Sequence, residues 1–337
     1  MRTSLRLNND VSPELFIRVA QAAEDAGFDQ IWVSNDLFLR AAPVLLAAAA
    51  RHTRRIGLGT CILNPYSMHP AEIAMAATTL QEVSGGRFRL GIAAGAQEFL
   101  GWAGIARAEP LARTREAVVA VRALLSGGRP ARVPGAGERW HDEAYLRVPP
   151  VPAPIYVGGM SPRMLELAGE VADGVLPLLF PPEHFPTARD QVVRGALRAG
   201  RDPSTLDVAA CIWCSADERM DRAHRALAEK IAYYGPSFAP YLLRRAGLDP
   251  SAFDDIRAAM AAGDPDRAAA LVTPPMLALG VAGSPEAIVA RCQRLVALGA
   301  RHLSFGPPLG PDVVRAVELL GARVLPALGG RAGSVPC

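Results

Sequence analysis

Short strand-like runs alternate with helix-like segments along almost the whole chain, and this rhythm limits the fold more than any single motif does. The first helical segment shows the usual signals, with Ser12 as a cap, Pro13 at its start and Gly27 after its end. Eight strand-like runs in 337 residues are the number that a (β/α)₈ TIM barrel requires. They span residues 3–7, 30–33, 55–63, 88–92, 155–157, 174–178, 206–213 and 301–305.

A doubly wound α/β sheet is the alternative fold. It would need a different division of residues 155–305, and no GxGxxG motif follows the first strand. We therefore expect a single barrel domain over residues 1–328, followed by a loose tail at 329–337. Segments 127–154, rich in Pro and Gly, and 235–275, helical with several breakers, interrupt the rhythm as insertions. We expect insertions at the C-terminal mouth of the barrel, the second of them shaping a substrate pocket.

Composition excludes several classes of function. A net charge of +3 gives no support for a nucleic-acid partner, and no apolar stretch reaches the roughly 18 residues of a membrane span. Met1 leads directly into a polar segment rather than a signal peptide, and five scattered cysteines are typical of free thiols, so we expect a cytoplasmic protein. No metal site is expected, because the six histidines lack metal-binding spacing and Cys211 and Cys214 should point to opposite faces of one strand.

One strand-to-helix turn has the features of a phosphate site. The apolar run 155–157 ends in Gly158 and Gly159, and Met160 and Ser161 lead into a helix that begins at Pro162. Paired glycines allow close approach of a ligand, and a helix start offers free N–H groups and a positive dipole end. An ordinary tight turn is the alternative interpretation.

Chemistry in a (β/α)₈ barrel lies at the C-terminal ends of the strands. Small and apolar side chains dominate these ends, and Asp36 and Glu98 are the only acids near the expected rim. Neither has a histidine beside it, and no Ser-His-Asp set is present. Such a mouth with one phosphate anchor favours a flat cofactor over hydrolysis, unless the rim residues merely pack. The expected mouth comprises residues 34–36, 60–64, 93–98, 158–161, 179–180, 213–214 and 306–308.

The chain resembles the bacterial-luciferase-like flavin and deazaflavin oxidoreductases, and within them the reductases of methylenetetrahydromethanopterin that use coenzyme F420. The resemblance extends over nearly the whole chain. Each motif is weak by itself, but their order is specific for the superfamily. The motifs are residues 23–28, 31–33, 57–66, 84–87 with Leu80, 90–92, 155–159, 172–174 and 306–312.

The resemblance implies a cofactor site, a small-molecule substrate and a homodimer. It implies a non-proline cis peptide at Cys61–Ile62 behind the cofactor ring, a phosphate held by residues 158–161, and an approach of the loop 95–97 to the ring. The implied cofactor-binding residues are Asn35, Thr60, Cys61, Ile62, Asn64, Gly95, Ala96, Gln97, Gly158, Gly159, Met160 and Ser161.

Two positions depart from the family pattern. Many relatives carry Asp-His where this chain has Asn35-Asp36, and the deazaflavin sugar-phosphate dehydrogenases carry Glu where it has Ala96. Their acid–base scheme for alcohol oxidation therefore does not transfer. Reduction of an activated double bond needs no base to remove a hydroxyl proton, because the reduced deazaflavin supplies hydride and the protein supplies orientation. Asp36 or Glu98 is available as a proton donor or to stabilise an iminium charge.

Three functional hypotheses follow. The first is an F420-dependent reductase that delivers hydride to a C=N or activated C=C bond of a pterin or of a biosynthetic imine or enamine. The second is an FMN-dependent monooxygenase, and the third is a non-catalytic barrel that binds a flavin. The aromatic candidates for lining a substrate pocket are Trp102, Phe180, Trp213 and Tyr234.

Overall fold

A closed barrel of parallel strands forms the centre of the protein. The computed structural model describes residues 1–137 and 140–329. Strands β1 to β6 pair in chain order, β6 also pairs with β7, and β9 joins β7 to β1. These eight strands confirm the predicted (β/α)₈ barrel. The strands are β1 (Arg2–Leu7), β2 (Gln30–Val33), β3 (Gly57–Thr60), β4 (Phe88–Ile92), β5 (Ile155–Gly159), β6 (Gly174–Pro177), β7 (Asp207–Ala216), β8 (Val281–Gly283) and β9 (His302–Leu309).

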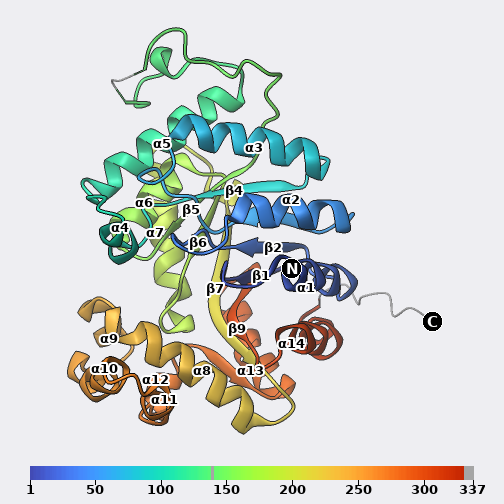
Figure 1. Cartoon of the computed structure of the whole chain (residues 1–337), viewed down its shortest axis with the longest axis vertical. Helices are drawn as coiled ribbons and strands as arrows, with labels where there is room; N and C mark the ends of the chain where they lie inside the picture. The colour runs from blue at the N-terminus through green and yellow to red at the C-terminus, as the bar shows by residue number, and fades with distance from the viewer. Residues whose placement is uncertain (138–139, 330–337) are drawn as a thin grey trace.

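Helices surround the barrel, as Figure 1 shows. Most of them follow a strand and return the chain to the N-terminal face, which parallel pairing requires. The helices are α1 (Pro13–Asp25), α2 (Ala42–His52), α3 (Pro70–Ser84), α4 (Gln97–Trp102), α5 (Pro110–Leu125), α6 (Pro162–Val171), α7 (Phe185–Arg198), α8 (Met220–Tyr234), α9 (Pro240–Arg245), α10 (Asp254–Ala261), α11 (Pro265–Ala270), α12 (Pro274–Leu277), α13 (Pro285–Ala297) and α14 (Val313–Leu319).

Local capping signals in the sequence explain several helix starts. The hydroxyl of Ser12 accepts a hydrogen bond from the backbone N–H of Leu15 over 3.2 Å at the start of α1. Ser161 and Ser284 cap α6 and α13 in the same way, and a proline occupies the first position of all three helices. A Ser cap followed by proline satisfies an otherwise free N–H and fixes the backbone for the first turn.

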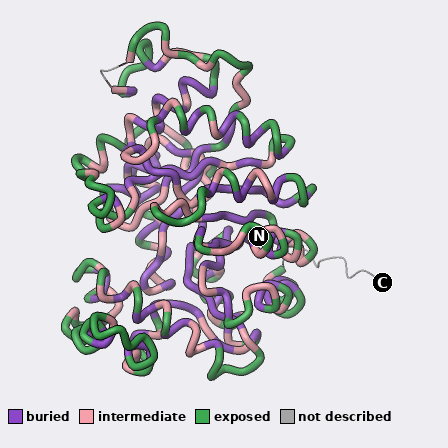
Figure 2. Tube along the Cα trace, viewed as in Figure 1, coloured by how far each residue is buried: buried purple, intermediate pink, exposed green. Residues whose placement is uncertain are grey.

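Two apolar layers hold the barrel together. The larger one lies between the strands and the surrounding helices, and Figure 2 shows that burial is concentrated along the strands. A smaller cluster fills the barrel interior with Trp32, Tyr156, Leu176, Ala209 and Cys211. Cys214 belongs to the larger outer layer, so the two cysteines of the CxxC point to opposite faces of β7 as predicted.

The structure adds a ninth strand to the eight that the sequence predicts. Strand β8 pairs with residues 214–216 at the C-terminal end of β7, outside the closed ring. It has only three residues, Val-Ala-Gly, which is too short for a periodic pattern. Strands β7 and β9 also continue past their expected ends, and Pro307 and Pro308 concealed the extension of β9 because proline rarely occupies a strand interior.

The two expected insertions lie on different parts of the molecule. The described part of 127–154 extends along α3, where Trp140 packs on His69 and the side chain of Gln81 donates to the carbonyl of Pro152. Segment 235–275 folds into short helices that pack on α8, at the lower left of the molecule in Figure 1. Neither segment contributes a described residue to the cavities presented below. Residues 330–337 of the expected tail lie outside the described residues.

Within residues 1–137 and 140–329, no helix combines the length and the apolar character that crossing a bilayer demands. Over the same residues, no three His, Cys, Asp or Glu side chains converge as ligands for a metal ion.

Buried polar side chains form a hydrogen-bonded row through the barrel interior. His302 on β9 contacts the carboxylate of Asp207 through Nδ1 over 3.1 Å and the hydroxyl of Ser4 through Nε2 over 2.8 Å. Ser4 then bonds Ser304 over 2.8 Å, and Nε of Arg6 donates to the Ser304 hydroxyl over 3.2 Å. The row ends at Arg6, so it orients this side chain toward the mouth of the barrel.

Replacement of Asp207 by Ala is expected to lower the free energy of unfolding by about 3–5 kcal/mol, the usual cost of leaving a buried charged or polar partner alone. Asp207 also accepts from the Tyr156 hydroxyl over 2.7 Å and pairs with Arg2. The substitution therefore strands several groups at once. Urea unfolding measures the effect, and Asp25→Ala, at an exposed position with no side-chain hydrogen bond or ion pair to a described residue, should hardly move the midpoint.

The same residue predicts a pH dependence of stability. Burial opposes ionisation, but the hydrogen bond and charge of His302, with Arg2 and Tyr156, hold the pKa of Asp207 well below its usual range. A depressed pKa gives stability that is present above the unfolded-state pKa of about 3.9 and is lost as pH falls through the folded-state value. Asp207→Ala should flatten this acid limb below about pH 4. A wild-type-like limb in the variant would contradict the assignment.

Candidate active site at the barrel mouth

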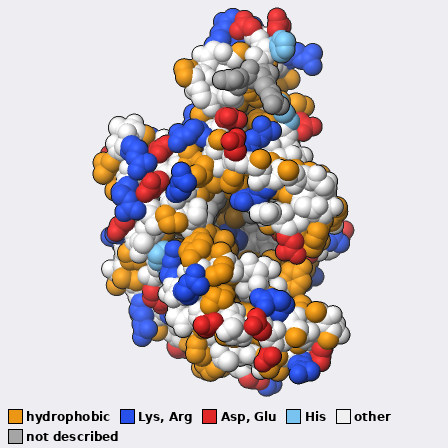
Figure 3. Space-filling model, turned by 90° about the vertical axis from the view of Figure 1, so that its left-hand side faces the viewer, with side chains coloured by type: hydrophobic (Ala, Val, Ile, Leu, Met, Phe, Trp, Pro, Cys, Tyr) orange, Lys and Arg blue, Asp and Glu red, His pale blue; other side chains and the backbone are white. Residues whose placement is uncertain are grey.

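A cavity of about 590 Å³ opens at the C-terminal ends of the strands. Its walls come from the ends of β1 and β9, the loop after β2, α4 and α8. Figure 3 shows this face hollowed near its middle, with hydrophobic side chains beside the hollow. The volume lies within the range of small-molecule sites. The polar and charged lining residues are Arg6, Asn8, Asp10, Asp36, Glu229, Lys230, Tyr233 and Tyr234.

A second, smaller hollow adjoins the cavity at the ends of β2, β3 and β4. Both share Asp36, Leu37 and Phe99 as lining residues. The smaller hollow is also lined by five of the residues that the resemblance implies for the cofactor: Asn35, Ile62, Asn64, Gly95 and Ala96. Residues from three strand ends therefore converge as expected of a barrel active site.

Asp36 lies where the two hollows meet. Its backbone N–H donates to the side chain of Asn9 over 3.2 Å, and the Asn9 amide donates in return to the carbonyl of Asp36 over 2.9 Å. The Ser34 hydroxyl donates to the Asp36 carboxylate over 3.2 Å. Burial raises the pKa of Asp36, against the lowering effects of Ser34 and of the Lys230 charge. A fixed carboxyl with a raised pKa in a cavity has the properties of a proton donor.

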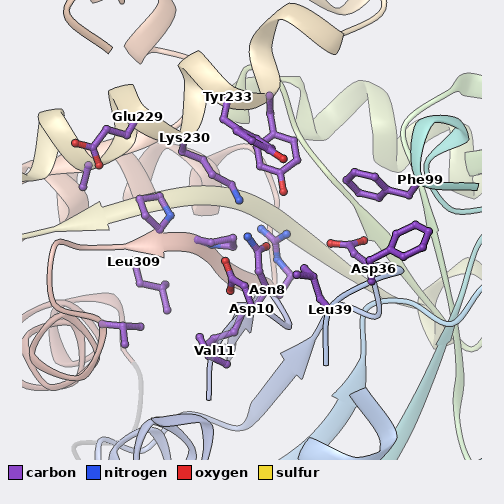
Figure 4. Close-up of a pocket in the computed structure, with 18 of the residues that line it drawn as sticks. Asn8, Asp10, Val11, Asp36, Leu39, Phe99, Glu229, Lys230, Tyr233 and Leu309 are labelled. Atoms are coloured by element: carbon purple, nitrogen blue, oxygen red, sulfur yellow. The ribbon is translucent and has the colours of Figure 1, made fainter. Parts of the chain in front are cut away.

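Lys230 is the only lysine of the chain, and it lies in this cavity. Figure 4 shows its amine end extending from α8 toward Asn8 and Asp10. The nitrogen lies 4.1 Å from the centre of the Tyr234 ring, a cation–π distance. Burial lowers the pKa of Lys230 to about 8, although the charges of Asp10 and Asp36 act to raise it. The site thus holds a cation that is partly removed from water.

The second predicted acid lies apart from Asp36. Glu98 is exposed on α4 and lines neither hollow. Asn35 lines the smaller hollow, but its side-chain oxygen accepts from the backbone N–H of Ala42 at the start of α2 over 2.9 Å. One end of the Asn35 amide is therefore committed to the fold.

The end of β3 contributes residues in different ways. The hydroxyl of Thr60 exchanges hydrogen bonds with the backbone of Gly91 and belongs to the barrel wall. The peptide between Cys61 and Ile62 is cis, as the resemblance implies. Ile62 lines the smaller hollow. Burial raises the pKa of the Cys61 thiol to about 12, so this cysteine is a neutral thiol near pH 7.

The loop after β4 lies against the loop after β3. The side-chain oxygen of Asn64 accepts from the backbone of Ser67 over 2.9 Å and fixes its own loop. Gly95 has a φ of +70°, and a side chain there would come within 3.2 Å of the Asn64 amide nitrogen. Glycine thus permits both the turn and the close approach. Ala96 and Gln97 are exposed at the start of α4.

The Gly-Gly turn adjoins Ile62 from the other side. A Cβ added to Gly158 would lie 3.1 Å from Cγ2 of Ile62 and 3.4 Å from Cβ of Ala93. A Cβ on Gly159 would meet the Met164 side chain at 2.6 Å. The Ser161 hydroxyl accepts from the backbone N–H of Met164 over 3.3 Å.

The Gly-Gly turn packs beside the cis peptide at Ile62 but lies outside both cavities. Residues 158–161 line neither the large cavity nor the smaller hollow. Met160 instead packs on the apolar cluster beneath α8.

The aromatic candidates divide into two groups. Trp102 and Tyr234 line the large cavity. Phe180 and Trp213 are buried against each other, with ring centres 4.6 Å apart, in the cluster between the barrel and α8. Tyr233, Phe38 and Phe99 are further aromatic lining residues that the sequence analysis did not name.

Four charged residues of the cavity were not predicted from the sequence: the cations Arg6 and Lys230 and the acids Asp10 and Glu229. Nη2 of Arg6 donates to the carbonyl of Ile212 over 2.7 Å, and the absence of a side chain at Gly306 leaves room for it. Two features of the sequence could have drawn attention to the two cations. Arg6 is a charged residue on a strand that is otherwise expected to be buried, and Lys230 is the single lysine among 36 lysine and arginine residues. Neither signal indicates that the two residues share a cavity.

Residues 2–302 match the family model for luciferase-like monooxygenases. The 5,10-methylenetetrahydromethanopterin reductase of Methanolobus tindarius is 35% identical over 308 residues, which cover 91% of this chain and 94% of that protein. The F420-dependent glucose-6-phosphate dehydrogenase of Nakamurella multipartita is 30% identical over 342 residues, covering 94% and 93%.

A solved structure gives the same likeness. The coenzyme F420-dependent tetrahydromethanopterin reductase from Methanopyrus kandleri superposes with a TM-score of 0.86 at 29% identity, covering 96% of this chain and 98% of that one. The relatives and this chain therefore correspond almost from end to end. The barrel, its strand-end cavity and the family match over most of the sequence together show that this chain belongs to the luciferase-like monooxygenase family.

Proposed function

We propose that this protein is an F420-dependent oxidoreductase that reduces a C=N or activated C=C bond of a small molecule. The observation that carries the proposal is the end-to-end likeness to F420-dependent reductases, with the corresponding strand-end cavity at the barrel mouth. The substrate is of the methylenetetrahydromethanopterin type or a biosynthetic imine or enamine. When bound, the reduced deazaflavin supplies the hydride.

The residues around the smaller hollow, whose own volume is only about 20 Å³, would contact one edge of a flat cofactor rather than enclose it. A Cβ at Gly158 would crowd Ile62 and Ala93, so glycine keeps the turn close to the cis peptide, and Gly95 allows the loop after β4 to approach Asn64. In the proposal, Ile62 supports the ring and residues 95–97 contact its edge. The turn 158–161 holds the phosphate through backbone N–H groups at the start of α6.

In the proposal, the residues at the larger cavity supply a proton and keep water away from the reacting groups. Asp36 lies close to where the two hollows meet. Its neutral carboxyl delivers a proton to the reduced bond, or its ionised carboxylate balances an iminium charge. The apolar rim excludes water around the reacting groups. Orientation is the main contribution of the protein in such a reaction.

Equilibrium binding of F420 and of FMN under the same salt conditions tests the proposal. We expect tight binding of F420 and weak binding of FMN, because proteins named as F420-dependent enzymes match this chain almost from end to end. A preference for FMN would instead support a flavin monooxygenase, and binding of neither would support a non-catalytic barrel. The homodimer and the cytoplasmic location stay predictions, and light scattering tests the first.

A further inference from the structure

We propose that the large cavity contains a carboxylate-binding subsite formed by Arg6 and Lys230, so that the substrate is a carboxylic acid with an apolar body. This inference rests on the proposed function, because it names the class of molecule that the reductase binds. It concerns the part of the cavity between the end of β1 and helix α8 (Figure 4).

Neither cation is neutralised by a carboxylate in direct contact. In residues 1–137 and 140–329, no Asp or Glu oxygen lies within 4.0 Å of a nitrogen of Arg6 or Lys230. Arg6 donates through Nε and Nη2 to neutral oxygens of Ser304 and Ile212, which leaves Nη1 without a hydrogen-bond partner among the described residues. Lys230 forms no hydrogen bond or ion pair with a described residue, and its nitrogen lies 4.1 Å from the centre of the Tyr234 ring and 5.9 Å from that of Trp213. Desolvated cations favour an anionic partner.

Arg6 is held in place for this task. The polar row inside the barrel fixes its Nε, and Gly306 provides the space for the guanidinium. Only 7% of Arg6 is exposed, so the side chain cannot turn out to bulk water to find a partner. A guanidinium with one free Nη and a nearby ammonium together match the two oxygens of a carboxylate.

The charge balance favours a monoanion over a phosphate. Asp10 and Asp36 line the same cavity and already oppose the two cations, while Glu229, which also lines it, is paired with Arg225. A dianion would leave excess negative charge in a partly buried site. A carboxylate adds a single negative charge near Asp36, which favours the protonated form of that carboxyl. A proton donor must hold this form.

The rim of the cavity selects the rest of the molecule. Four lining residues at the mouth are large, apolar or aromatic, and unusually exposed: Phe38 at 67%, Leu39 at 49%, Trp102 at 61% and Tyr233 at 54%. Exposed apolar side chains gathered at one opening mark a binding surface. A substrate with a carboxylate at Arg6 and Lys230 and an apolar body at the rim would match both the pair of cations and the apolar side chains of the cavity.

Binding of simple acids and of their neutral amides tests the subsite without knowledge of the natural substrate. The probes are benzoate and 3-phenylpropanoate, each with its amide and with phenyl phosphate as the dianion, titrated calorimetrically into the F420-loaded protein. We expect the acids to bind at least tenfold more tightly than the amides. Lys230→Met should abolish most of this preference, Lys230→Arg should retain it, and Arg222→Met, an exposed cation on the same helix, should not change it.

The outcomes separate the subsite from the proposed function. Equal binding of acids and amides to F420-loaded protein would overturn the subsite and leave the reductase assignment intact. Tighter binding of phenyl phosphate than of the acids would overturn the choice of a carboxylate. A loss of F420 affinity in Lys230→Met would assign the cation to the cofactor instead. If F420 fails to bind but the protein without cofactor still prefers the acids to the amides, the proposed function falls and the subsite stands.

Discussion

Replacement of Asp36 by Asn is expected to slow reduction of an imine acceptor about 10²- to 10⁴-fold, the usual contribution of a positioned general acid. Asn preserves the size and the contact with Ser34 but cannot release a proton. Single-turnover oxidation of the reduced cofactor measures the rate, and the dissociation constant of F420 should stay unchanged. Glu98→Gln offers a direct comparison, because Glu98 is exposed and lines neither hollow.

The pH profile gives this prediction a second readout. A proton donor acts in its protonated form, so the wild-type rate should fall as pH rises through the pKa of Asp36, which burial has raised. In Asp36→Asn this descending limb should disappear, because Asn does not titrate. A rate within threefold of wild type and an unchanged pH profile would remove Asp36 from the mechanism.

Replacement of Gly158 by Trp is expected to weaken F420 binding at least 100-fold, which corresponds to about 2.7 kcal/mol. The Cβ alone would lie 3.1 Å from Ile62 and 3.4 Å from Ala93, so the indole must occupy space above the turn. Fluorescence titration with F420 measures the loss. Gly158→Ala should have a smaller effect, because a methyl group requires only slight movement of its neighbours.

Loss of binding is informative only in a folded variant. Gly158 lies at the end of β5, paired with Leu176 on β6, so circular dichroism and thermal unfolding must first show an intact barrel. A folded Gly158→Trp protein with wild-type affinity would mean that the phosphate binds elsewhere. In that case the turn would have only the role of starting helix α6.

Local chemistry made much of the fold predictable. Each βα unit carries its own signals, such as the Ser12 cap with Pro13, and a parallel barrel repeats the unit without needing long-range information. Strands β2 and β4 therefore begin and end where the pattern predicts. Strand β8 escaped because three residues are too few for periodicity, and its pairing with β7 is a tertiary contact.

The candidate site was only partly predictable for a related reason. Residues at strand ends, such as Asp36 and Ile62, follow from the topology, because parallel strands bring their C-terminal ends to one face. Lys230 lies on a helix after β7, and its periodicity shows only that α8 is amphipathic. Glu98 follows the end of a barrel strand, as Asp36 does, and was therefore predicted at the site. Its position on helix α4 instead leaves it exposed.

By itself, the sequence determined the barrel, its helix caps and the Gly-Gly turn, because these depend on residues within a few positions of one another. The tertiary structure alone decided that Arg6 and Lys230 line one cavity without an acid in contact. It also decided that a polar row leads from Asp207 through the barrel interior to Arg6. Such convergence depends on packing between strands and helices far apart in the chain, and no local periodicity encodes the direction of one side chain toward another.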